Sequence, residues 1–122
     1  MSTQKVILCV DDEVDILELF RDEFLELDYK VLEASNGVDA FEIFQNNKID
    51  CVVSDIRMPG GDGVSLVKNI KGEGSEIPIY LVTGFSDYTT EDLTNLGVNA
   101  VIFKPFDLEE VVEMVKAEVE KE

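Results

Sequence analysis

Three acidic residues stand where apolar stretches of the sequence end: Asp55 closes one such stretch, and the pair Asp11-Asp12 closes an earlier one. If the two stretches are neighbouring parallel strands, the three carboxylates meet at one edge of a sheet. Like charges placed that close repel one another, and something must compensate the repulsion. A divalent cation with oxygen ligands, such as Mg²⁺, would do so. The sequence therefore predicts a Mg²⁺-dependent site at which a carboxylate accepts a phosphoryl group.

Two more polar residues follow later apolar stretches and suit the same chemistry. Lys104 would balance the charge on the acceptor and phosphoryl oxygens, and the Thr83 hydroxyl would donate a hydrogen bond to a phosphoryl oxygen. Asp55 would be the nucleophile, which needs only to be ionised and exposed. Asp11 and Asp12 would hold the metal ion.

Each of these residues also has an ordinary structural explanation. The acidic pair would by itself most often cap the next helix, through Asp12 or Glu13. Thr83 alone would belong to a turn, Lys104 alone would be a solvated or ion-paired lysine, and Asp55 alone would be a loop acid. Their joint occurrence after four of five apolar stretches favours a shared site.

Short apolar stretches alternate with amphipathic ones along the chain. Apolar residues recur at helical spacing between the stretches, and Asp107 with Glu110 forms a capping-box-like start for the last helix. The fourth helical segment, about 89–96, is weak because it is rich in threonine, and Gly97 ends it. The expected strands are 6–10, 31–34, 51–54, 79–83 and 101–103.

Five strands alternating with five helices predict an α/β fold with a doubly wound parallel sheet. Strands that are nearly all apolar fit a sheet covered on both faces. The 122 residues contain no linker-like segment or repeat, so one domain is expected to span 1–122. Ligands of such folds bind beyond the carboxyl ends of the strands, where the candidate residues stand. Ser35-Asn36-Gly37, after the second strand, is instead expected to form a turn and helix cap.

Composition restricts the partners and the chemistry. The net charge of −17 argues against nucleic acid and against anionic membrane surfaces. No apolar stretch approaches the length of a membrane span, and the N-terminus lacks a signal-peptide pattern. Cys9 and Cys51 are expected to be buried, reduced thiols in a cytoplasmic protein. The absence of histidine excludes histidine-based catalytic triads.

Taken together, the motifs resemble those of a response-regulator receiver domain of two-component signalling, over essentially the whole chain. The resemblance implies the flavodoxin-like (βα)5 fold with strand order 2-1-3-4-5. The matching motifs are Asp11-Asp12-Glu13, Asp55-Ile56-Arg57-Met58-Pro59 with Asp62-Gly63, Thr83-Gly84, and Lys104-Pro105-Phe106.

The resemblance also implies roles for these residues. Asp55 would accept a phosphoryl group from a histidine kinase or a phosphotransfer protein, and Thr83 and Lys104 would contact that group. Mg²⁺ would be bound by Asp55, by Asp12 directly, by Asp11 through water and by the backbone carbonyl of Arg57. The domain would be no enzyme beyond catalysing its own phosphorylation and dephosphorylation. It would regulate an unknown output partner through the surface around its fourth helix and fifth strand, either as a stand-alone protein or as part of a longer chain.

Some features depart from the family pattern or concern the conformational change expected on phosphorylation. Val101 stands where similar receivers carry an aromatic residue. We therefore expect the segment 85–96, beginning with Phe85, to carry the conformational response to phosphorylation, and this response to be smaller than in receivers with the aromatic residue. Gly61 replaces a bulkier residue and is expected to loosen its loop. The resemblance further implies a cis peptide bond before Pro105.

Three other functions compete with this interpretation. A haloacid-dehalogenase-like phosphatase needs a second acid two residues after its nucleophile, where this chain has Arg57. A flavin-binding electron carrier needs Ser, Thr or Gly after the first strand, where two aspartates would repel the phosphate. A purely structural interaction module would neither bind Mg²⁺ nor be modified at Asp55.

Overall fold

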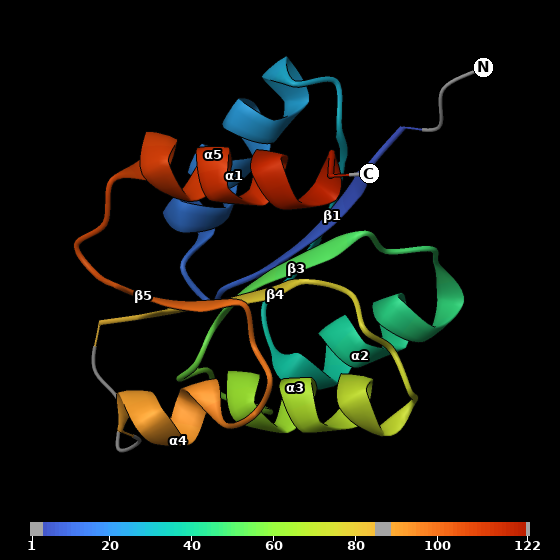
Figure 1. The fold of residues 1–122 in the computed structure, drawn as a ribbon, viewed down its shortest axis with the longest axis vertical. Coiled ribbons are helices and arrows are strands. Elements are labelled where there is room, and N and C mark those ends of the chain that lie inside the picture. The colour runs from blue at the N-terminus through green and yellow to red at the C-terminus, as the bar shows by residue number, and fades with distance from the viewer. Residues whose placement is uncertain (1–3, 85–88, 122) are drawn as a thin grey trace.

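The computed structural model describes residues 4–84 and 89–121. Within them, five parallel strands form one sheet in the order β2-β1-β3-β4-β5, as predicted (Figure 1). The strands are β1 (Val6–Val10), β2 (Lys30–Ala34), β3 (Cys51–Asp55), β4 (Ile79–Thr83) and β5 (Ala100–Phe103). The helices are α1 (Val14–Glu26), α2 (Gly37–Asn46), α3 (Gly63–Gly72), α4 (Thr90–Thr94) and α5 (Leu108–Val119).

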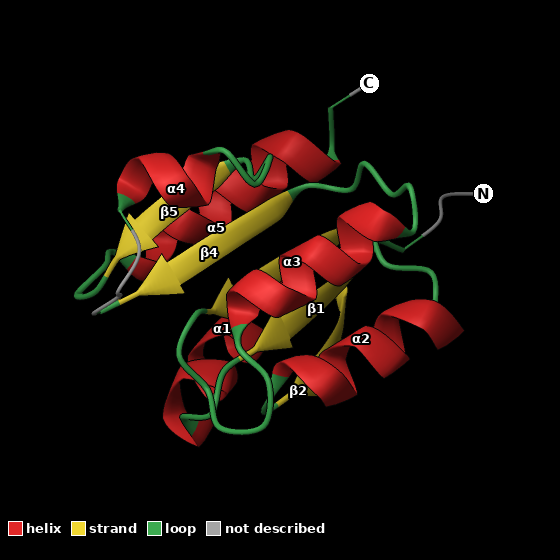
Figure 2. Ribbon diagram, turned by 90° about the horizontal axis from the view of Figure 1, so that it is seen from below, coloured by secondary structure: helices red, strands yellow, loops and turns green. Residues whose placement is uncertain are grey.

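Helices cover both faces of the sheet: α1 and α5 lie on one face, and α2, α3 and α4 lie on the other (Figures 1 and 2). Alternate residues of β1 divide between the two cores. Ile7 and Cys9 pack under α1 and α5, whereas Leu8 and Val10 pack under the other three helices. Because residues 7–10 of β1 are all buried, the strand is apolar throughout rather than alternating.

The register of the sheet aligns the residues that follow the strands. The last paired residue of β1 precedes Asp11, and its partner in β3 precedes Asp55, so these two acids are level with each other. Thr83 ends β4 and pairs with the last residue of β5, which Lys104 follows. The four candidate residues therefore meet at one edge of the sheet.

Side-chain caps begin several helices as the sequence predicted. Asn36 caps α2 by accepting a hydrogen bond from the Asp39 backbone N–H at 2.8 Å. Asp107 caps α5 by accepting one from the Glu110 N–H at 3.3 Å. These side chains satisfy backbone donors that the first turn of a helix leaves without partners.

The weak fourth helix is shorter than expected. It covers only Thr90–Thr94, and a reciprocal capping box between Thr89 and Asp92 holds its first turn. The chain then turns at Gly97, whose φ of +88° suits glycine. The predicted range of 89–96 thus included the cap and the following turn.

Cys9 and Cys51 are both buried and free, as expected. Among the helices of residues 4–84 and 89–121, none has the length and apolar character required to cross a bilayer.

Candidate metal and phosphoryl-acceptor site

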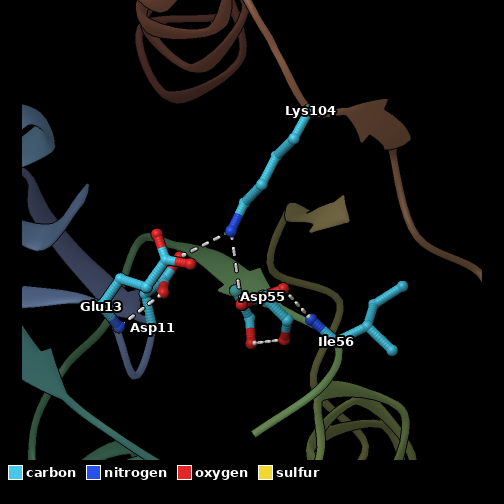
Figure 3. A network of polar contacts seen from close by, with 6 residues as sticks. Asp11, Glu13, Asp55, Ile56 and Lys104 are labelled. Atoms are coloured by element: carbon cyan, nitrogen blue, oxygen red, sulfur yellow. Dashed lines mark hydrogen bonds and ion pairs between the residues drawn. The ribbon is translucent and has the colours of Figure 1, made fainter. Parts of the chain in front are cut away.

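The strand ends bring three buried polar side chains together. Asp11, Asp55 and Thr83 are 3%, 7% and 1% exposed, respectively. Asp12, the neighbour of Asp11, is exposed. Lys104 reaches the group from the β5 side of the sheet (Figure 3).

Lys104 forms ion pairs with both buried carboxylates. Its Nζ lies 3.4 Å from Oδ2 of Asp55 and 3.6 Å from Oδ2 of Asp11. The Lys104 side chain is 20% exposed, so these pairs are less screened by water than surface pairs are. One ammonium group therefore contacts the two carboxylates that the sheet register places side by side (Figure 3).

Backbone donors fix the other oxygen of each buried acid. Oδ1 of Asp11 accepts a hydrogen bond from the Glu13 N–H at 2.8 Å, and Oδ1 of Asp55 accepts one from the Ile56 N–H at 2.8 Å. Glu13 is the N-cap residue of α1, but its side chain makes no capping hydrogen bond. The Asp11 carboxylate is thus held at the site, with its Oδ2 facing Lys104.

Burial and mutual repulsion make the site unfavourable for negative charge. Burial raises the pKa of Asp11 to about 6, and repulsion by Asp55 adds to the rise, against the opposing effects of the Glu13 N–H and Lys104. Burial also raises the pKa of Asp55, although Lys104 and the Ile56 N–H oppose it. Burial alone would lower the pKa of Lys104, but Asp11 and Asp55 raise it above its usual value.

The acids form a donor set that fits Mg²⁺. One carboxylate oxygen each from Asp11, Asp12 and Asp55 lies within 4.8 Å of the others. An all-oxygen set with two or more carboxylates is the kind that Mg²⁺ prefers. Lys104 supplies one positive charge against three carboxylates, so the cluster has capacity for a further cation.

The backbone joins the two residues predicted to contact the phosphoryl group. The Lys104 N–H donates to the Thr83 carbonyl at 2.8 Å. The Lys104-Pro105 peptide bond is cis, which confirms the expectation from the resemblance. Arg57, whose carbonyl was predicted to bind the metal, is exposed at the start of the β3–α3 loop.

Gly63 was named in the sequence analysis only as part of a motif, and the structure shows its packing role. A Cβ atom on Gly63 would lie 2.3 Å from the carbonyl oxygen of Asp55, and the Gly63 N–H donates to the Ile56 carbonyl at 2.8 Å. The sequence placed Gly63 in a motif directly after Asp62, which caps α3, but gave no sign of its close approach to Asp55.

The proposed switch can be described only in part. Val101 is half-buried and packs on the core under α2, α3 and α4. Phe103, by contrast, is 56% exposed. Phe85 and the rest of 85–88 lie outside the described residues, so the predicted role of 85–96 stays a prediction.

Comparisons with known proteins agree with this geometry. Residues 7–116 match the family model described as the response regulator receiver domain. The chain belongs to this family. It is a receiver domain of two-component signalling, a kind of domain that is phosphorylated on an aspartate with Mg²⁺ and regulates a partner. As such, it is not an enzyme in the usual sense.

Individual relatives of the receiver domain differ in length. Sporulation initiation phosphotransferase F of Bacillus subtilis (strain 168) is 31% identical over 117 residues, which are 95% of this chain and 94% of that protein. Response regulator MprA of Mycobacterium sp. (strain KMS) is 34% identical over 113 residues, 91% of this chain but 49% of that protein. The chain thus spans about half the length of most of the first curated relatives that it matches.

Solved structures include a similar receiver in a metal-bound state. The response regulator TrrA from Thermotoga maritima, in complex with Mg²⁺-BeF, is 35% identical and superposes with a TM-score of 0.82. The match covers 93% of this chain and 97% of that one. Chemotaxis response regulator CheY4 of Vibrio cholerae is 25% identical, with a TM-score of 0.84 over 93% of this chain and 98% of that one.

Proposed function

We propose that Asp55 is the residue that accepts the phosphoryl group. The observation that carries the proposal is the position of its carboxylate. It stands at the end of β3, level with Asp11, with one oxygen bound to the Ile56 N–H and the other 3.4 Å from Lys104 Nζ. In the reaction, an Asp55 oxygen forms a bond to phosphorus while the bond from phosphorus to the donor breaks.

The neighbouring residues would stabilise the transferred group. Lys104 already contacts both acids and would balance the charge that gathers on the phosphoryl oxygens. The Thr83 hydroxyl would donate a hydrogen bond to one of those oxygens. These two residues have the same roles when the acyl phosphate is hydrolysed, so the domain would promote its own phosphorylation and dephosphorylation.

Mg²⁺ would be held by carboxylate oxygens of Asp12 and Asp55, by Asp11 through water, and by the backbone carbonyl of Arg57. When bound, it would neutralise the clustered carboxylates and the incoming phosphoryl oxygens. Support comes from the three oxygens that lie within 4.8 Å of one another and from the Mg²⁺-BeF complex of the similar TrrA receiver.

The signalling context follows from the same assignment. The phosphoryl donor would be a histidine kinase or a phosphotransfer protein, and residues 1–122 would act as a single receiver domain that regulates an output partner protein. The domain itself would contact neither nucleic acid nor membrane, as its net charge of −17 suggests. We place it in the cytoplasm.

The direct test of the acceptor is labelling with a small phosphodonor, such as acetyl phosphate, in the presence of Mg²⁺. We expect one phosphoryl group per chain, located on Asp55 by mass spectrometry of the borohydride-reduced protein. Asp55→Asn should abolish the modification because an amide is a poor nucleophile. A variant that is still labelled at the normal level, on any residue, would contradict the assignment.

The metal site is tested with Asp12→Ala. Asp12 is exposed, so we expect the variant to fold while losing Mg²⁺-dependent labelling. The matched control is Asp15→Ala, which removes an exposed acid from the first turn of α1 and should be labelled like the original protein. Equal labelling of both variants would refute the proposed role of Asp12.

A further inference from the structure

The loop between β3 and α3 carries Arg57 and is attached to the rest of the molecule at several points. Ile56 and Met58 anchor its beginning, because they are 1% and 8% exposed in the core under α2, α3 and α4. Its end is closed by Gly63, which donates to the Ile56 carbonyl and lies against the carbonyl of Asp55. Between these anchors the loop extends outward through residues 59–62.

The outer part of this loop is held by the first residue of α2, which lies far away in the sequence. The Gly37 N–H donates to the Gly61 carbonyl at 2.8 Å. Gly61 itself has a φ of +126°, a conformation suited to glycine. The contact therefore joins the N-terminus of α2 to the loop that leads from Asp55 to α3.

Gly37 allows this contact because it lacks a side chain. A Cβ atom there would lie 2.8 Å from the Asp62 carbonyl oxygen and 2.9 Å from the Gly61 carbonyl oxygen. Both contacts are with backbone atoms, which cannot rotate away as a flexible side chain can. The φ of Gly37 is not positive, so close approach, rather than backbone conformation, is what requires glycine at this position.

If a side chain were added at Gly37, the loop would move more easily than the helix. One turn further along α2, Ala40 is fully buried in the core. Of the loop residues, Gly60 is exposed and Gly61 and Asp62 are half-buried, so they give way at lower cost. Their displacement passes to Gly63, whose Cβ position is 2.3 Å from the Asp55 carbonyl.

We propose that Gly37 is a positioning residue for the metal site: its contact with the loop at residues 61–62 holds the Arg57 carbonyl and the Asp55 backbone where Mg²⁺ binds. The inference rests on the proposed function, since it takes Arg57 and Asp55 as metal ligands. Residues that orient metal ligands from outside typically change metal affinity by about ten- to a hundredfold when they are altered. Coupling is reciprocal, so Mg²⁺ binding must also strengthen the contact between Gly37 and Gly61.

The test compares Gly37→Ala with two matched controls in the full chain. Gly72→Ala adds the same methyl group to α3, where nothing lies within 4 Å, and Gln45→Ala truncates an exposed, uncharged residue of α2. The Mg²⁺ dissociation constant is measured from amide chemical shifts, and urea unfolding in EDTA shows whether each variant folds. We expect a dissociation constant raised about tenfold in Gly37→Ala and nearly unchanged values in both controls.

A merely structural glycine gives a different result. Gly37→Ala would then lose stability equally with and without Mg²⁺, and unchanged metal affinity in the folded variant overturns the inference. If the variant does not fold, the test is the chemical shift of the Gly37 amide in the original protein during a Mg²⁺ titration. If the Gly37 amide shift changes with Mg²⁺ concentration and has the same midpoint as the Asp55 amide shift, the result supports the coupling. If the Gly37 amide shift does not change, the result refutes it. If the original protein binds no Mg²⁺ at all, the proposed function fails and the inference falls with it.

Discussion

At the scale of single residues, two adjacent aspartates have different environments. Asp11 is 3% exposed, and both of its oxygens have contacts, one with the Glu13 N–H and the other with Lys104. Asp12 is exposed. The Asp11 carboxylate is therefore held in place before any metal arrives, at the cost of a raised pKa, while Asp12 is the accessible donor.

The raised pKa of Asp11 predicts how the stability of the metal-free protein depends on pH. Its pKa is about 6 in the folded protein and about 3.9 in an unfolded chain. Between these values the folded state holds a proton that the unfolded state has lost. The contribution of Asp11 therefore favours folding below about pH 4 and is lost as the pH rises through about 6.

Urea unfolding in EDTA, from pH 4 to pH 7, measures this effect against Asp11→Asn. We expect the free energy of unfolding of the original protein to fall by about 2 kcal/mol relative to the variant across this range. The exposed acid Asp15, replaced by Asn, is the control and should give a curve parallel to the original. Parallel curves for Asp11→Asn as well would show that Asp11 is not desolvated.

At the scale of elements, apolar patterning was enough to predict the sheet and its helices. The strands starting at Val6 and Ile79 were placed with their observed bounds, and the other three differ by one residue at one end. The site residues Asp55, Thr83 and Lys104 could be predicted because parallel strands place their carboxyl ends at one edge. The contact between Gly37 and Gly61 could not, because it joins residues distant in sequence and leaves no periodic pattern.

Helix α4 shows how local chemistry replaced the missing pattern. It has only five residues, and its start depends on the capping box of Thr89 and Asp92. The buried Leu93 is its anchor to the core. Isolated helices this short are unstable in water, so the cap and the packing of Leu93 and the adjacent Leu96 on the core stabilise α4.

We therefore expect Thr89→Ala to loosen α4 selectively. Loss of an N-cap costs about 1 kcal/mol, and here it also removes one half of the capping box. Amide hydrogen exchange should become faster in residues 92–95 while exchange in α5 stays the same. Thr90→Ala, at the exposed first position of the helix, is the control. Equal protection of α4 in both variants would mean that packing on the core holds the helix without the cap.

At the scale of the whole molecule, two kinds of repulsion oppose folding. The net charge of −17 destabilises the compact state through general self-repulsion. The second kind is local, among the three carboxylates whose oxygens lie within 4.8 Å of one another. Salt screens exposed charges, but it screens the two buried carboxylates of this cluster, Asp11 and Asp55, much less.

The two contributions should separate when NaCl and MgCl₂ are compared in urea unfolding experiments. NaCl should raise the free energy of unfolding gradually, by about 1 kcal/mol at 0.5 M, without saturating at millimolar concentrations. Mg²⁺ should act as a ligand of the folded state, adding about 1.4 kcal/mol at ten times its dissociation constant. In Asp12→Asn, NaCl should still raise the free energy of unfolding, because one charge among many changes little. Millimolar Mg²⁺ should no longer raise it. If Mg²⁺ stabilises the variant and the original protein alike, Mg²⁺ acts on the general charge of the surface and not on the aspartate cluster.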